Sequence, residues 1–79
     1  MMKVVRDDII SAIRAAKVVV EPHKLNDEVA LSDQGIDSLG LFNILLIIQD
    51  KYGVNIPDSD IDKLSTINMF IDYLNGYLD

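Results

Sequence analysis

The stretch DSLGLFNILLIIQDKYGVNIP, residues 37–57, holds the most apolar segment of the chain together with its two boundary signals. Asp37 is a favourable N-cap residue, because its side-chain oxygen can accept a hydrogen bond from an amide of the first turn. Gly53 suits the left-handed position that follows the last turn of a helix. The stretch therefore predicts a helix that starts at Asp37 or Ser38 and ends at Tyr52.

Upstream of this stretch, the sequence predicts one helix followed by a long loop. Apolar residues recur at helical spacing from about Val4 to Val18. Pro22 breaks this pattern, and the residues from Glu21 to Ile36 show no sustained periodicity. A loop of this length favours either a function or packing by its own apolar residues. The helical stripe consists of Val5, Ile9, Ala12, Ile13 and Ala16, and the loop's apolar residues are Leu25, Val29, Leu31 and Ile36.

Downstream of the same stretch, the sequence predicts one short and one longer helix. A short helical piece is expected over Ser59–Leu64, with Asp58 or Ser59 as its cap, and Ser65 or Thr66 then caps a final helix. No segment shows strand alternation bounded by hairpin turns. The predicted fold class is all-α, a small four-helix bundle of three longer helices and one short one. The apolar stripe of the final helix consists of Ile67, Phe70, Ile71, Leu74 and Leu78.

The composition describes one small domain, residues 1–79, with enough apolar side chains for a core. The chain has 79 residues, 49% of them hydrophobic, and no cysteine. The lack of cysteine excludes disulfides, thiolate metal sites and cysteine nucleophiles, and it is compatible with a cytoplasmic location. The first residues do not form a secretory signal pattern, and the apolar segment Leu41–Ile48 is far too short to span a membrane.

The charge is unevenly distributed along the chain. The formal net charge is −6, which argues against nucleic-acid binding because phosphate contacts need clustered Lys and Arg. Residues 1–24 hold five basic and three acidic side chains, whereas residues 25–79 hold two basic and ten acidic ones. This acidity either attracts basic partner surfaces or only keeps a small domain soluble.

Two possible reactive or metal-binding groups are set aside. His23 is the only histidine, and it lies in a polar loop without a second histidine or a recognisable catalytic spacing. Asp58, Asp60 and Asp62 match the first ligand spacings of a calcium loop, but the required glycine and glutamate are replaced by Lys63 and Met69. We therefore predict neither a metal site nor a catalytic residue.

Ser38 allows three interpretations from its surroundings alone. As part of a helix cap it needs no further function, and local chemistry by itself favours that interpretation. As a catalytic nucleophile it lacks the G-x-S-x-G pattern, since its context is GIDSLG. As an attachment point it is well placed, because an anionic phosphodiester is favoured beside the unpaired amides of a first helical turn.

The spacing of several motifs then favours attachment. LSDQGIDSLG, followed by YGVNIPDSDIDKLSTINMFIDYLNGYL, resembles the acyl carrier protein family of phosphopantetheine-dependent carriers over residues 31–74. The resemblance implies that Ser38 receives 4′-phosphopantetheine from coenzyme A, with Asp37 capping the helix beside it. It also implies a monomeric carrier without catalytic activity. A magnesium-dependent phosphopantetheinyl transferase would add the arm, and loading and processing enzymes would act on an acyl or aminoacyl thioester.

The resemblance also bears on the kind of carrier. Gly40 stands where many fatty-acid carriers have an acid, which points to a carrier dedicated to one pathway. The alternatives are a D-alanyl or aminoacyl carrier and an unmodified helical interaction module.

The resemblance and the helical wheel together suggest two further groups of residues. The residues expected to recognise partners are Asp37, Leu39, Gly40, Asn43, Leu46, Ile47, Asp60 and Asp62. The residues expected either to line an acyl-chain cleft or to pack in the core are Ile44, Ile48, Ile61, Leu64 and Tyr73.

Overall fold

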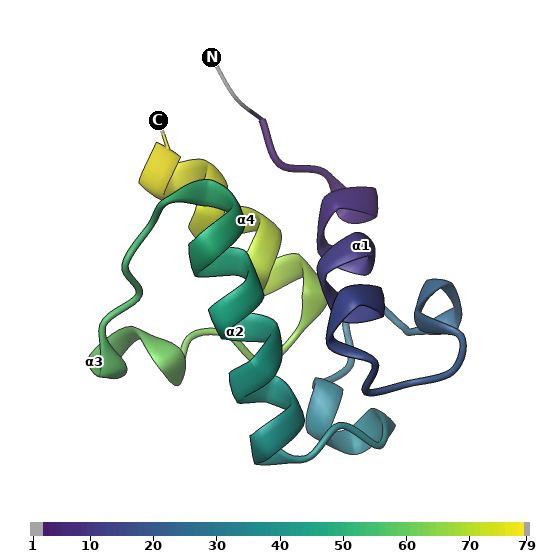
Figure 1. Cartoon of the computed structure of the whole chain (residues 1–79). Coiled ribbons are helices and arrows are strands. Elements are labelled where there is room, and N and C mark those ends of the chain that lie inside the picture. Colours follow the sequence, from purple (N-terminus) through teal and green to yellow (C-terminus); the bar gives the residue numbers. More distant parts are fainter. Residues whose placement is uncertain (1–2, 79) are drawn as a thin grey trace.

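The structure is a computed structural model that describes residues 3–78, and over this range it contains helices and no strand (Figure 1). Three longer helices and one short helix make up the bundle, which confirms the predicted all-α fold. Two short 3-10 turns, η1 and η2, lie in the long loop. The elements are α1 Arg6–Ala16, η1 Pro22–Lys24, η2 Leu31–Gln34, α2 Ser38–Tyr52, α3 Asp58–Ile61 and α4 Ile67–Leu78.

The predicted boundaries of α2 are both confirmed by backbone geometry. Asp37 is the N-cap residue, and its Oδ1 accepts a hydrogen bond from the amide of Gly40 at 2.8 Å. Gly53 adopts a left-handed conformation with φ of 64° at the other end. The amide of Val54 then donates to the carbonyl of Gln49 at 3.2 Å, which closes the last turn.

Helix α1 is shorter than its apolar pattern suggested. Lys17 adopts a left-handed conformation with φ of 57° and ends the helix after Ala16. Val5 is the extended N-cap residue and is 49% exposed, so its predicted place in the buried stripe is wrong. Val4 is buried instead. Its amide donates a hydrogen bond to Asn75 Oδ1 at 2.7 Å, and Asn75 Nδ2 donates one to the Val4 carbonyl at 3.0 Å. This pair of bonds fixes the N-terminal segment against α4.

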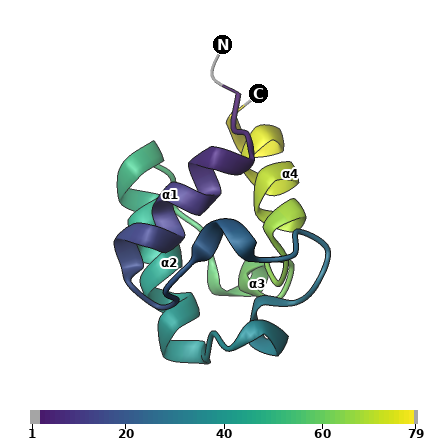
Figure 2. The same ribbon diagram turned by 90° about the vertical axis from the view of Figure 1, so that its right-hand side faces the viewer.

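The long loop is held in place by hydrogen bonds to α1 and to the start of α4. Arg6 donates from Nε to Asp27 Oδ1 at 2.7 Å, and its Nη2 donates to two loop carbonyl oxygens at 3.0 Å each. The amide of Leu31 donates to the carbonyl of Ser65 at 2.8 Å. Figure 2 shows the loop, in blue, reaching across from the end of α1 toward α4. The loop therefore packs as part of the domain, with Leu31 and Ile36 buried and Val29 exposed.

The caps of the two later helices differ from each other. Thr66 caps α4, because its Oγ1 accepts a hydrogen bond from the amide of Met69 at 3.1 Å. Helix α3 spans Asp58–Ile61 and has Pro57 at its N-cap position without a side-chain hydrogen bond. The prediction that Asp58 or Ser59 caps this helix is therefore wrong, because the helix begins one residue earlier than the pattern suggested.

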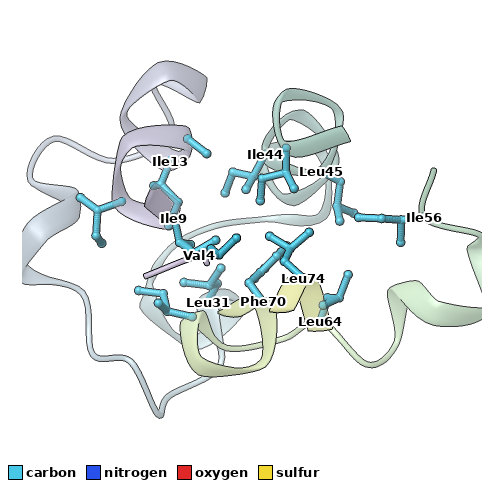
Figure 3. Packing of buried hydrophobic residues seen from close by; sticks show 14 of the residues in the cluster. Val4, Ile9, Ile13, Leu31, Ile44, Leu45, Ile56, Leu64, Phe70 and Leu74 are labelled. Atoms are coloured by element: carbon cyan, nitrogen blue, oxygen red, sulfur yellow. The ribbon is translucent and has the colours of Figure 1, made fainter. Parts of the chain in front are cut away.

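The core lies between α1, α2 and α4, as Figure 3 shows. Ile9 and Ile13 of α1 and Ile44 of α2 are all 0% exposed. Phe70 and Leu74 of α4 are also 0% exposed, which confirms the predicted inward stripe of that helix at these positions. Further buried apolar residues include Val4, Leu31, Ile36, Leu45, Ile48, Val54, Ile56, Leu64 and Ile67. The side chain of Leu78, which was predicted to belong to the same stripe, lies outside the described part.

Gly76 is expected to be a site where one substitution stabilises the protein. It lies within α4, and a Cβ built there meets no atom within 4 Å. Because glycine in a helix costs roughly 0.5–1 kcal/mol relative to alanine, Gly76→Ala should raise the free energy of unfolding by about that amount. Urea unfolding followed by circular dichroism measures the change. A lower stability would contradict the open space seen at this position.

Candidate functional site

Ser38 is the first residue of α2 and is exposed to solvent. In Figure 1 the start of this helix, in teal, lies at the lower end of the bundle. The amides of Ser38 and Leu39 have no helical carbonyl to bind, because they precede the first intrahelical hydrogen bond. The helix dipole adds a partial positive charge at the same end. These features fit an anionic group attached to the Ser38 hydroxyl.

The segment before Ser38 gives this hydroxyl a defined position. Gly35 turns the chain with φ of 90°, and Ile36 is buried with 2% of its surface exposed. The carboxylate of Asp37 accepts a hydrogen bond from the amide of Gly40, which fixes its orientation. The predicted role of Asp37 as helix cap is therefore confirmed. The backbone at Ser38 is fixed by the buried Ile36 before it and by the hydrogen bond between Asp37 and the Gly40 amide after it.

Gly40, which was expected among the partner-recognition residues, is buried, so its predicted place on the exposed side of α2 is wrong. A Cβ at this position would lie 3.0 Å from Val18 Cγ1 and 3.2 Å from Ile36 Cγ2. The first turn of α2 presents this side to the residues that follow α1, a contact that the helical pattern alone does not reveal. Close packing within the chain therefore accounts for glycine at this position.

The outward side of α2 contains three of the residues expected to recognise partners. Leu39 is 70% exposed and Leu46 is 60% exposed, and Asn43 is also exposed. Ile47 is only half-buried and packs against the core. Phe42, with 53% of its surface exposed, was missed in the sequence analysis. Its spacing of three residues from Leu39 and four from Leu46 was the signal that could have identified it.

The residues expected to line an acyl-chain cleft do not form one surface. Ile44 and Ile48 are 0% exposed and Leu64 is 1% exposed, so these three belong to the closed core. Ile61 borders a hollow of about 210 Å³ between α2 and α3, which Phe42 and Leu46 also line. Tyr73 borders a different hollow, of about 640 Å³, between α3 and α4. The structure thus supports core packing for three of the five residues.

A hydrogen bond between Tyr73 and Asp60 joins α3 to α4. The Tyr73 hydroxyl donates to Asp60 Oδ2 at 2.7 Å, and Lys63 Nζ lies 3.5 Å from the other carboxylate oxygen. The bond to Asp60 raises the pKa of Tyr73 to about 12, with burial and charge as smaller causes. The bond from Tyr73 also lowers the pKa of Asp60, and the charge of Lys63 acts in the same direction. Both groups are thereby held in the protonation states that suit the bond.

This hydrogen bond predicts a particular dependence of stability on pH. The pKa of Asp60 is lower in the folded than in the unfolded state. Asp60 therefore stabilises the fold at pH values above its unfolded-state pKa, and this stabilisation is lost as pH falls through its folded-state pKa. Tyr73→Phe removes the donor and should reduce the stability difference between about pH 7 and about pH 3. Urea unfolding midpoints at the two pH values measure it. An unchanged difference would show that the bond does not contribute.

The positions set aside in the sequence analysis gain no support as metal or catalytic sites. Within the described residues, no group of three or more His, Cys, Asp or Glu side chains is arranged to hold a metal ion. His23 is an exposed loop residue whose carbonyl accepts a hydrogen bond from Arg6. None of the helices in residues 3–78 has the length and hydropathy needed to cross a membrane.

Comparison with known proteins places the chain in a family. The family model described as "Phosphopantetheine attachment site" matches residues 8–74. An acyl carrier protein from Thermosynechococcus vestitus is 31% identical over 68 residues, which cover 85% of this chain and 84% of the relative. The chain therefore belongs to the phosphopantetheine-dependent acyl carrier proteins.

A solved structure supports the fold independently. The butyryl-acyl carrier protein of the actinorhodin polyketide synthase from Streptomyces coelicolor superposes with a TM-score of 0.82. The match covers 98% of this chain and 93% of that protein, at 24% sequence identity. At this identity the likeness confirms the helical fold, as the sequence analysis predicted.

Membership of this family defines the general activity of the protein. It presents acyl intermediates as thioesters on a covalent 4′-phosphopantetheine group, and it is a carrier, not a catalyst. The arm supplies the thiol that this cysteine-free chain lacks. Such a carrier interacts with a phosphopantetheinyl transferase and with biosynthetic enzymes.

Proposed function

We propose that Ser38 is the residue that carries 4′-phosphopantetheine. The observation that supports this most directly is the exposed Ser38 hydroxyl at the capped start of α2, inside the region that matches the family model. The first-turn amides and the positive end of the helix favour the phosphate of the arm. The carboxylate of Asp37 lies close by, but the amide of Gly40 binds it at 2.8 Å and offsets part of its charge.

The chain's own residues would position the arm and contribute little chemistry. Asp37 and the buried Ile36 hold the backbone, so that the Ser38 hydroxyl presents itself to a transferase at a fixed place on the surface. The transferase, which we expect to use magnesium, supplies the activation of this hydroxyl. When bound, the arm provides the thiol on which an acyl group is held.

The partners are proposed to meet the protein around the start of α2. Leu39, Asn43 and Leu46 are exposed there, and Asp37 lies at the edge of the same region. Asp60 and Asp62, which belong to α3 and its end, add negative charge at the rim. We propose a monomeric single-domain carrier, dedicated to one pathway, that works in the cytoplasm with loading and processing enzymes for its acyl cargo.

Mass spectrometry tests the attachment directly. The protein is incubated with coenzyme A, magnesium and a phosphopantetheinyl transferase of broad specificity, and its intact mass is measured. We expect one arm per chain, and peptide mapping should place it on the peptide that contains Ser38. A protein that gains no mass, or gains it on another residue, would overturn the proposal.

A further inference from the structure

The hollow of about 640 Å³ between α3 and α4 has the size and lining of a small binding site. Sites of this kind combine aromatic or apolar walls with a few polar groups that fix the ligand. Asp72, Tyr73, Gly76 and Tyr77 of α4 form one wall, and Asp60 of α3 belongs to the other. The four residues of α4 are neighbours on the helix surface, because Asp72 and Gly76, like Tyr73 and Tyr77, are four positions apart.

This hollow is separate from the attachment site. Its described lining residues all lie between positions 55 and 77, whereas the surroundings of Ser38 are built from residues 35–40. Tyr73, Gly76 and Tyr77 belong to the C-terminal half of α4, which Figure 1 shows in yellow at the end of the bundle opposite the start of α2. A ligand in the hollow therefore leaves the Ser38 hydroxyl accessible.

The lining of the hollow is anionic. Asp60 and Asp72 contribute carboxylates, and no Lys or Arg is found among the described lining residues. Asp60 already has partners, because the Tyr73 hydroxyl donates to its Oδ2 at 2.7 Å and Lys63 Nζ lies 3.5 Å from its Oδ1. Asp72 is exposed and forms no ion pair within residues 3–78. Asp72 is therefore the carboxylate available to a positively charged ligand.

Two tyrosine rings lie beside these carboxylates. The ring centroids of Tyr73 and Tyr77 are 6.2 Å apart, and the ring planes are inclined by 30°. Tyr77 is 51% exposed, so much of its surface is open to a ligand. A guanidinium group stacks on an aromatic ring while its N–H groups donate to a carboxylate, a combination that neither an anion nor a neutral apolar ligand can use. The lining therefore favours a planar cation.

Gly76 leaves room in the same wall. It lines the hollow, and a Cβ built at this position meets no atom within 4 Å. A leucine at residue 76 would therefore occupy open space without displacing a neighbour at its Cβ. The space can be filled in this way without removing either the rings or the carboxylates.

We propose that the hollow between α3 and α4 binds a guanidinium group, which stacks on Tyr77 and pairs with the carboxylate of Asp72. Asp60 and Tyr73 hold the two walls together through their hydrogen bond and add negative charge beside the ligand. Two sources offer this chemistry: a small free guanidine and an arginine side chain of another protein. This site goes beyond the proposed function and does not depend on Ser38.

Titrations of the unmodified protein, followed by ¹H–¹⁵N correlation NMR, test the proposal. The probe is methylguanidinium chloride, and methylurea is the matched control because it has nearly the same shape without the charge. We expect methylguanidinium to shift the amide signals of residues 72–77 with a saturable, millimolar dissociation constant, and methylurea to leave them in place. Sodium chloride at equal ionic strength provides the salt control.

Two capped peptides distinguish the sources of the guanidinium group. One is Gly-Arg-Gly, and the other is Gly-citrulline-Gly, in which the side chain is neutral. Tighter binding of the arginine peptide than of methylguanidinium identifies a protein side chain as the ligand, and weaker binding identifies a small free guanidine. Either result supports the site, provided that the citrulline peptide does not bind.

Variants locate the site within the hollow. Asp72→Asn and Tyr77→Leu should each weaken binding of methylguanidinium by about three- to fivefold. Gly76→Leu should weaken it by about tenfold or more, because the side chain fills the space that the ligand occupies. Asp50→Asn and Phe42→Leu are the matched controls, since they remove an exposed acid and a 53% exposed aromatic ring elsewhere. Both should change the affinity by less than about twofold.

Three results would overturn the proposal. The first is an equal response to methylurea, and the second is wild-type affinity in both Asp72→Asn and Tyr77→Leu. The third is signal shifts confined to residues outside the hollow. If Tyr77→Leu loses the dispersed spectrum of a folded protein, the exposed Asp72→Asn and Gly76→Leu decide the question. Because no arm is transferred in these titrations, their failure leaves the proposed attachment at Ser38 unaffected.

Discussion

Ser38→Ala is expected to abolish attachment of phosphopantetheine, so that the protein keeps its unmodified mass after incubation with coenzyme A, magnesium and the transferase. The Ser38 oxygen is the atom proposed to form the phosphodiester, and alanine has no group that replaces it. Because Ser38 is exposed and is not the cap, the free energy of unfolding should change by less than about 0.5 kcal/mol. Intact mass and urea unfolding measure the two effects separately.

Ser59→Ala is the matched control for this substitution. Ser59 is also exposed, follows an aspartate and lies in the first turn of a helix, α3. It therefore has the same local sequence, Asp-Ser, without the capped start of a long helix. We expect Ser59→Ala to gain one arm at the wild-type rate. Modification of the Ser38→Ala protein would show that another residue carries the arm.

Phe70→Ala is expected to have the largest effect on stability. Phe70 is 0% exposed and belongs to the core cluster between α1, α2 and α4. Truncating a buried phenylalanine to alanine costs about 3–5 kcal/mol, because it removes apolar burial and leaves a cavity. A domain of this size has a total stability of only about 5–15 kcal/mol, so the variant should be partly unfolded or close to it. Urea unfolding at neutral pH measures the loss.

Phe42→Ala provides the comparison for that experiment. The chemical change is identical, but Phe42 is 53% exposed, so less apolar surface is removed from a packed environment. We expect a change in the free energy of unfolding of less than about 1 kcal/mol. Similar losses in the two variants would contradict the burial seen in the structure.

The framework of the fold is predictable because its signals are local. The Asp37 cap and the Gly53 terminus of α2 each depend on residues within one turn, and both appear as expected. The same holds for Thr66 at the start of α4. Short-range signals fail where a neighbouring segment decides which residue is buried. Val5 becomes the N-cap residue of α1, and Val4 is buried in its place because Asn75 of α4 binds the Val4 amide.

The details of the site were harder to predict for a physical reason. Nearly every position from Leu39 to Ile48 is apolar, so the helical pattern has little contrast between inward and outward faces. Phe42 therefore could not be separated from the core residues by hydrophobicity. The burial of Gly40 depends on Val18 and Ile36, which reach it through a loop whose path is set by long-range hydrogen bonds.

The close packing at Gly40 also limits how this carrier can be re-engineered for foreign pathways. A designer who wishes to redirect it toward enzymes with basic surfaces would first consider an acid directly after the Asp37–Ser38–Leu39 motif. At that position the new Cβ would lie 3.0 Å from Val18 Cγ1 and 3.2 Å from Ile36 Cγ2, so these two side chains would have to move by a few tenths of an ångström. The exposed Asn43, one turn further along, accepts a carboxylate without such a shift. Residue 43 is therefore the better first position at which to add an acid.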